Sequence, residues 1–333
     1  MRKTLLSLIV VVVVALGAVL WSRHHHRTSS SPAPTTTTTV RPSIAPLTGL
    51  SDPSHLANAR PALTIKVENT PDALPQWGID RADVVYEEIV NGGITRLAAI
   101  FNSQAPPRVG PVRSVRPTDT SIVWPLGGLF AYSGGAQYAV NSISRAPVKL
   151  IDESSAGGAM YRDPTRYAPH NLFASAAALF QFKATPVPPP ALFTYRSDTW
   201  GKGTRKVNGF TVPFPSIYPV TWTWNTTTLS WDRTLFAKPI ITGTGVRVSP
   251  RNVVVMWVNY INGIGTMASY ADLGGSGPVE VFSDGRMVSG TWSRGSSKSD
   301  VITYHTSAGK TIAMKRGQTW VELLNTGVPV PIR

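Results

Sequence analysis

The sequence predicts an α+β fold: an N-terminal α/β sheet domain followed by a mainly β C-terminal domain, preceded by a single transmembrane helix. Three observations lead to this prediction. The chain of 333 residues contains 28 Gly and 28 Pro, which favours β structure and ordered loops over helix bundles. Strand-like and helical runs are interspersed in the first half, whereas strand-like runs follow one another in the second half. A long apolar run stands near the N-terminus.

The N-terminal residues predict an anchor and a stalk. Leu5–Trp21 is apolar except for Ser7, and its length is at the lower edge of the roughly 17–25 residues that span a bilayer. Residues 15–18 match a signal-peptide cleavage site poorly. We therefore expect residues 1–22 to be a cytoplasmic tip and membrane anchor; cleavage would instead give a secreted protein. Residues 23–43 are rich in Ser, Thr and Pro, and we expect a disordered stalk that leaves the bulk of the chain outside the cytoplasm.

Residues 44–185 predict the α/β domain. Runs of β-branched and aromatic residues predict strands at 62–68, 82–90, 95–101 and 129–133. The short gap at 91–93 favours a hairpin between the second and third strands. We expect helices at 118–124, with Thr118 or Asp119 near its N-cap, at 136–145 and at 175–183.

The Pro-rich segment 185–190 predicts a domain boundary, and residues 191–333 predict the mainly β domain. Short runs separated by turn residues predict its strands. We expect the tryptophans at 222, 224, 231 and 292 to pack in the core or on a sheet face. The expected strands are 220–224, 229–232, 252–258, 279–282, 291–294, 301–306, 311–315 and 319–323.

The composition narrows the range of functions. The net charge is +14, which favours binding to polyanions. We expect no nucleic-acid partner, because the sequence predicts an anchor and a stalk and contains no recognition helix or RNA-binding motif. The absence of Cys excludes disulfides, a Cys nucleophile and lipid attachment through Cys. The histidines at 55, 170 and 305 show no metal-site spacing, and we expect neither a metal ion nor a cofactor.

An Arg-rich loop is the strongest functional signal. Arg108, Arg113 and Arg116 fall within nine residues, and Gly110-Pro111 restricts the backbone between the first two. Each guanidinium offers a planar fork of donors that suits carboxylate, phosphate or sulfate. The alternative is that these arginines pair with nearby acids and brace the loops. The loop contains too few acids of its own to neutralise them.

Several motifs resemble the YerB-like family of bacterial envelope proteins. The resemblance implies a surface-exposed, membrane-attached protein with two adjoining domains, and it implies no enzyme activity. Members typically look like lipoproteins, so the missing Cys would require a transmembrane anchor instead. The motifs are PLTGL at 46–50, RPALTIKVEN at 60–69, GGITR at 92–96, GPVRSVRP at 110–117, YSGG at 132–135 and APHNLF at 168–173.

We therefore expect a protein that binds an anionic or glycan ligand of the cell envelope, either a polymer or a small molecule. The alternative is a wall-component hydrolase or transferase in which His170 acts with Glu87 or Glu88, and Ser114 is the nucleophile if His170 reaches it. No hydrolase motif occurs, which favours binding over catalysis. The sequence does not predict the oligomeric state. The expected ligand-binding residues are Arg96, Arg108, Arg113, Arg116, Gly92, Gly93, Gly134, Gly135, His170 and Asn171.

Overall fold

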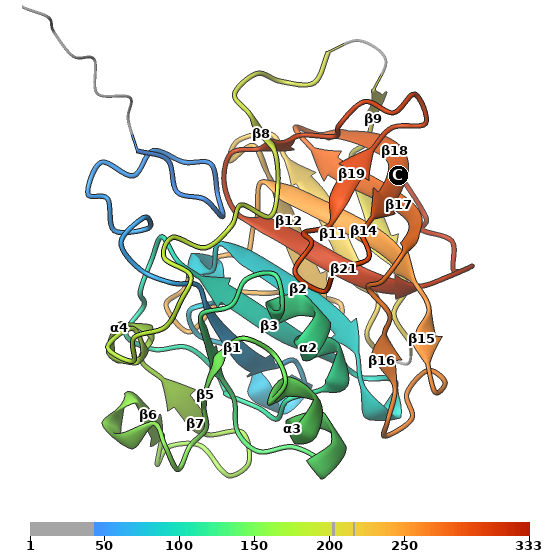
Figure 1. Ribbon diagram of the computed structural model, residues 1–333. Helices are drawn as coiled ribbons and strands as arrows, with labels where there is room; N and C mark the ends of the chain where they lie inside the picture. Colours follow the sequence, from blue (N-terminus) through green and yellow to red (C-terminus); the bar gives the residue numbers. More distant parts are fainter. Residues whose placement is uncertain (1–42, 202–203, 216) are drawn as a thin grey trace, which may run out of the picture. The chain divides into compact units, whose positions relative to one another are not determined.

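A long mixed sheet runs through both halves of the chain (Figure 1). The structure is a computed structural model that describes residues 43–201, 204–215 and 217–333. Within these residues the sheet has eleven strands. In order they are β19 (Thr303–His305), β18 (Arg286–Ser293), β17 (Ser276–Ser283), β14 (Asn252–Val258), β21 (Thr319–Asn325), β2 (Val84–Ile89), β3 (Thr95–Phe101), β1 (Leu63–Glu68), β4 (Leu129–Ala131) and β5 (Lys149–Ile151), with β9 (Arg205–Lys206) pairing with β18.

The strands of the first half form where the sequence predicts them. Every residue of β1, β2 and β3 is buried, as expected of central strands with both faces covered. β2 and β3 form the predicted hairpin, in which Glu88 lies opposite Arg96. A short 3-10 turn, η3 (Asn91–Gly93), joins the two strands. Gly92 has a φ of 77° there, which favours glycine.

β21 joins the two halves of the sheet. It is parallel to β14 on one side and to β2 on the other, so that Thr319 lies opposite both Asn252 and Val84. The predicted boundary at 185–190 therefore does not coincide with a break in the sheet. The described residues belong to one compact unit, because a strand from the C-terminal half completes the pairing of a strand from the N-terminal half.

A second, antiparallel sheet packs on the first through aromatic side chains. Phe210 stacks on Phe282 with ring centroids 3.5 Å apart, and Trp222 meets Trp320 edge-on at 5.5 Å. The expected packing of the tryptophans is confirmed, since three are fully buried and Trp224 is half-buried against Trp231. The strands of this sheet are β10 (Gly209–Val212), β11 (Val220–Asn225), β12 (Ser230–Leu235) and β13 (Lys238–Pro239).

Three short helices accompany the sheets in the described residues: α2 (Pro117–Val123), α3 (Gln137–Ile143) and α4 (Ala176–Leu179). The first two confirm the prediction and pack together, whereas α4 is much shorter than the expected 175–183. Thr118 and Asp119 lie near the N-cap of α2, as the sequence predicts. Arg116 is the N-cap because Pro117 occupies the first helical position, and Asp119 closes a capping box by accepting from Arg116 N at 2.6 Å.

Short elements complete the described chain. The expected strand at 311–315 is reduced to a two-residue pairing. These elements are β6 (Met160–Arg162) with β7 (Leu172–Ala174), β8 (Tyr195–Arg196) with β20 (Met314–Lys315), β15 (Tyr260–Ile261) with β16 (Tyr270–Ala271), and the 3-10 turns η1 (Pro71–Ala73), η2 (Ile79–Arg81) and η4 (Gly157–Ala159).

The expected anchor at residues 1–22 lies outside the described residues, as does all but the last residue of the expected stalk at 23–43. In the part of the chain that the structure describes, no helix combines the length and apolar character needed to cross a membrane.

Candidate functional site

The Arg-rich loop lies beside the end of β1, and its backbone is fixed on both sides. Arg113 N donates to Lys66 O at 2.9 Å, and Val115 N donates to Gly134 O at 3.1 Å. The loop therefore runs between β1 and the turn after β4, where it meets Gly134, one of the expected ligand-binding residues. The side chains of Arg113 and Arg116 start from this fixed backbone.

Arg108 does not join the other arginines of the loop. Its guanidinium is ion-paired with Asp163 and packs between two rings, 4.4 Å from the centroid of Trp77 and 3.9 Å from that of Phe173. The predicted grouping of all the arginines is therefore wrong for Arg108. The backbone turn at the cis peptide between Gly110 and Pro111 separates it from the residues that follow.

Glu68, at the end of β1, connects Arg113 to His170. Its carboxylate lies 3.2 Å from Arg113 Nε and 2.9 Å from His170 Nδ1, and it accepts a hydrogen bond from Thr70. Glu68 itself is fully buried. The predicted pairing of His170 with Glu87 or Glu88 is therefore wrong. The acidic residue at the end of the predicted strand 62–68 was the signal that could have identified Glu68.

Arg96 and Arg116 have no carboxylate at ion-pair distance in the described chain. Arg96 donates to Ser114 O at 3.1 Å, and Arg116 donates to Val115 O at 2.9 Å and to Asn91 Oδ1 at 2.6 Å. Burial lowers the pKa of Arg96 to about 9, and the nearby charges of Arg116 and Arg113 contribute. We call Arg96, Arg113 and Arg116 the arginine cluster.

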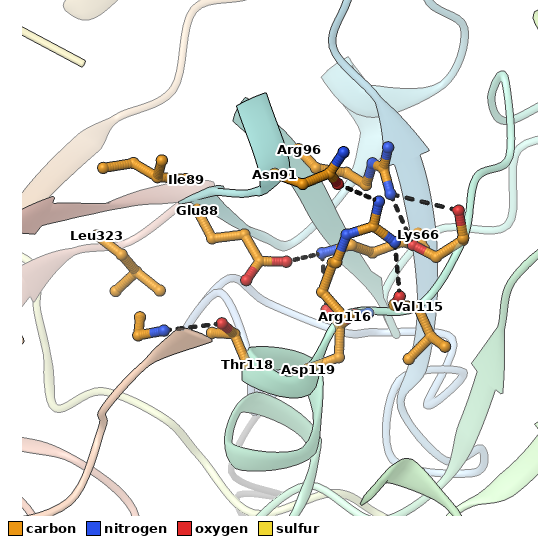
Figure 2. Close-up of polar contacts among 12 residues, drawn as sticks. Lys66, Glu88, Ile89, Asn91, Arg96, Val115, Arg116, Thr118, Asp119 and Leu323 are labelled. Atoms are coloured by element: carbon orange, nitrogen blue, oxygen red, sulfur yellow. Dashed lines mark hydrogen bonds and ion pairs between the residues drawn. The ribbon is translucent and has the colours of Figure 1, made fainter. Parts of the chain in front are cut away.

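A buried ionic group lies beside Arg96 and Arg116 of the arginine cluster (Figure 2). Lys66 donates to Glu88 and, at 2.7 Å, to Asp119, and all three side chains are almost completely buried. Burial raises the pKa of Asp119 to about 6, although the charge of Lys66 opposes this shift. Glu88 is therefore committed to Lys66 and is not a free base.

Glu87 and Glu88 point to opposite faces of the sheet, as the alternation of side chains in a strand requires. Glu87 is ion-paired with Arg233 at 2.7 Å and accepts from Asn69 at 3.0 Å. Both members of the Glu87–Arg233 pair are fully buried. Neither glutamate is placed to assist His170, which removes the acid–base pair that the sequence predicts.

The two Gly pairs differ from each other, and the first does not fit the predicted role in ligand binding. Gly92 N donates to Gly265 O at 2.7 Å and Gly93 N donates to Val90 O at 3.1 Å, so these N–H groups are not available to a ligand. Gly134 is exposed with open space beside it, and Gly135 allows the close approach of Val115. Only the second pair leaves the backbone accessible.

Asn171 and Ser114 also have structural partners. The Asn171 side chain accepts from Arg162 at 2.8 Å and donates to Arg166 O at 3.3 Å, so it braces the loop before β7. Ser114 Oγ lies 3.4 Å from Arg96 Nη1. Within the described residues Ser114 makes no hydrogen bond to His170, which argues against a Ser–His nucleophile.

Two cavities flank these groups. One, of about 640 Å³, is lined by Arg108, Asp72, Tyr167 and His170 among others. The other, of about 460 Å³, begins at Pro117, the residue after Arg116, and lies between α2 and residues of the C-terminal half. Arg108 and His170 therefore line the first cavity, whereas no member of the arginine cluster lines the second, which adjoins the cluster only through Pro117.

Comparisons with known proteins identify relatives across most of the chain. Residues 47–185 match the model "Protein of unknown function (DUF3048) N-terminal domain", and residues 210–321 match the corresponding C-terminal domain. A protein named "Putative lipoprotein YerB" from Bacillus subtilis (strain 168) is 34% identical over 132 residues, which are 39% of this chain and 40% of that protein. The crystal structure of YerB protein from Bacillus subtilis superposes with a TM-score of 0.74 at 23% identity, covering 87% of this chain and 99% of that one.

Proposed function

The chain belongs to the DUF3048 family, whose N-terminal and C-terminal domains it contains, and on that premise we propose that it binds an anionic group of the cell envelope through Arg96, Arg113 and Arg116. The single observation that carries this proposal is that Arg96 and Arg116 lie together without a carboxylate partner in the described chain. A guanidinium whose charge is not neutralised can donate to an incoming carboxylate or phosphate.

The balance of charges around the arginine cluster supports the proposal. Four cationic side chains, the cluster and Lys66, face three carboxylates, Glu68, Glu88 and Asp119. A positive charge is therefore left over in a largely desolvated setting, where electrostatic interactions are stronger than in water. An anion that reaches Arg116 would offset the mutual repulsion of the arginines.

We also propose that the protein acts at the envelope. A relative is named as a lipoprotein, whereas this chain has no Cys for a lipid. A single-pass helix in residues 1–22 would then hold the bulk of the chain outside the cytoplasm. Wall phosphopolymers, peptidoglycan carboxylates and lipid phosphates are the anionic groups available there.

The test is the binding of inorganic tripolyphosphate to the full-length protein in non-ionic detergent, measured by calorimetry at low and high salt. Arg116→Gln should weaken binding by about tenfold or more, since one charge-assisted hydrogen bond contributes about 1.5–3 kcal/mol. Arg145→Gln, at an exposed arginine outside the arginine cluster and outside the linings of both cavities, is the matched control. Unchanged binding in Arg116→Gln, or a loss of several kcal/mol in its stability, would show that Arg116 only braces the loop.

A second candidate function is acid–base catalysis at His170. The observation in its favour is that buried Glu68 holds Nδ1 at 2.9 Å while the ring lines the cavity of about 640 Å³. A carboxylate that orients an imidazole in this way leaves Nε2 available for proton transfer. Incubation with isolated wall material should then release fragments detectable by mass spectrometry. The release of fragments must be lost in His170→Ala but not in the control His305→Gln. If the protein instead stays bound to the wall material and releases no fragments, the binding function is favoured.

A further inference from the structure

The cavity of about 460 Å³ is built from both halves of the chain. α2 and α3 supply one wall, and the hairpin of β15 and β16 with the loop after β18 supplies the other. Tyr138 on α3 donates to Met267 O across it. Figure 1 shows the β15–β16 hairpin beside α2 and α3.

The lining combines aromatic rings with small polar groups. Trp124, Tyr138 and Tyr270 all line the cavity, and Tyr138 is 41% exposed. Thr120 and Ser142 add hydroxyl groups that lie 2.9 Å apart. Aromatic faces suit the apolar faces of sugar rings, while hydroxyl groups suit the sugar hydroxyls, and a pocket with a few convergent polar groups is typical of ligand sites.

The cavity is also positively charged. Arg294 and Lys298 line it, and no Asp or Glu does among the described residues. Arg294 donates to three backbone carbonyls, those of Asp300, Ser121 and Lys298. These bonds hold the guanidinium in place but do not neutralise its charge.

The cavity adjoins the arginine cluster at Arg116, although none of the three arginines lines it. Pro117 and Tyr138 both line the cavity. Pro117 follows Arg116 directly, and Tyr138 lies close enough to Arg116 to influence its pKa, which burial lowers. A cyclic ligand in the cavity would therefore place a charged substituent near Arg116.

We propose that the cavity and the arginine cluster together bind an acidic oligosaccharide, with a sugar ring against Tyr138 and Trp124 and a carboxylate or phosphate substituent on the arginines. This inference rests on the proposed anion-binding function and adds the class of ligand. The rings supply affinity for the sugar, and the arginines discriminate in favour of its charged form.

The experiment compares three probes on the full-length protein in non-ionic detergent: tetragalacturonate, its methyl ester and tripolyphosphate. The ester keeps the rings without the charge, and tripolyphosphate keeps charge without rings. Tetragalacturonate should bind at least tenfold more tightly than either. Tyr138→Ala should weaken the binding of tetragalacturonate at least tenfold and leave the affinity for tripolyphosphate within twofold of the wild type. Arg116→Gln should weaken the binding of both.

The controls separate this inference from the proposed function. Tyr161→Ala removes a tyrosine that lies outside the cavity and is 40% exposed, compared with 41% for Tyr138. This variant should bind all three probes as the wild type does. Ser121→Leu fills the cavity from α2 without removing an aromatic ring and should act like Tyr138→Ala. If tripolyphosphate binds but Tyr138→Ala and Ser121→Leu leave tetragalacturonate unaffected, the glycan inference fails while anion binding stands. If neither anion binds, both proposals fail.

Discussion

Asp83 shows at the scale of one residue how burial outweighs hydrogen bonding in setting a pKa. Its carboxylate accepts from the backbone N–H groups of Asn102 and Ser103 and from the Ser103 hydroxyl. These bonds favour the ionised form, but burial disfavours it more strongly and raises the pKa of Asp83 to about 6. Between about pH 4 and pH 6, folded Asp83 therefore keeps a proton that the unfolded chain releases.

This difference gives a pH-dependent stability. The stabilisation from the bound proton is complete below about pH 4, the ordinary pKa of Asp, and is lost as the pH rises through about 6. Asp83→Asn should keep the three bonds, with its oxygen accepting the two backbone N–H groups. Between pH 4 and pH 7 the free energy of unfolding should fall by on the order of 3 kcal/mol more for the wild type than for the variant. Urea denaturation across this range measures both curves, and parallel curves would contradict the raised pKa.

The individual site residues could be predicted only in part. The spacing of Arg113 and Arg116 and the turn at Gly134 were visible in the sequence, because residue type and local spacing determine them. The partner of His170 was not, since Glu68 lies 102 residues away and their contact depends on tertiary packing. The alternative that the loop arginines pair with acids holds for Arg108, but its partner Asp163 lies 55 residues away, so local spacing could not select it.

At the scale of the element, the two turns around β4 differ in what a side chain would meet. Gly128 and Gly134 both have a left-handed backbone, with φ of 81° and 65°. A Cβ at Gly128 would lie 2.2 Å from Ala62 O, whereas a Cβ at Gly134 would meet nothing within 4 Å. The first turn is therefore crowded against β1, and the second is restricted by its backbone conformation alone.

Alanine substitutions at these two glycines should therefore differ in cost. Gly134→Ala should lower the free energy of unfolding by only about 1–2 kcal/mol, which is the cost of a left-handed backbone at a residue with a Cβ. Gly128→Ala should lower the free energy of unfolding by more than about 3 kcal/mol, because the cost of displacing β1 or β4 is added to the cost of the left-handed backbone. Urea denaturation of the two variants measures the difference. Equal losses would show that the close approach of Ala62 O does not constrain the turn.

The elements with strong local patterns could be predicted, and the others could not. Residues 62–68, 252–258 and 319–323 are rich in β-branched and apolar residues, and each forms a strand. The run 175–183 favours a helix by composition, but the chain turns after Leu179, so α4 stops after four residues. β18 extends further back than expected because it pairs along its whole length with β17.

At the scale of the whole molecule, local sequence patterns could not predict that one sheet continues through both halves of the chain. A strand-like run predicts a strand but not its neighbour, and Val84 pairs with Thr319 from the far end of the chain. The Pro-rich segment 185–190 indicated a boundary. The two halves nevertheless share one sheet, so the arginine cluster of the first half and the cavity wall of the second keep a fixed relation.

The buried pair Arg233–Glu87 tests this coupling, because it joins β12 of the second sheet to β2 of the main sheet. Arg233→Met leaves Glu87 buried without a cationic partner and should cost about 3–5 kcal/mol of unfolding free energy. Glu87→Gln removes the ion pair of Arg233 with Glu87 and should also destabilise the fold. The double variant should recover much of the loss, since it removes both charges.

The four free energies come from urea denaturation, and additive losses would mean that the two charges do not depend on each other. The tripolyphosphate affinity of the double variant adds a second reading. Neither residue belongs to the arginine cluster, so recovered stability with wild-type affinity would show that the pair holds the sheets together without shaping the binding site. Recovered stability with weakened affinity would instead show that the alignment of the two halves extends to the arginines.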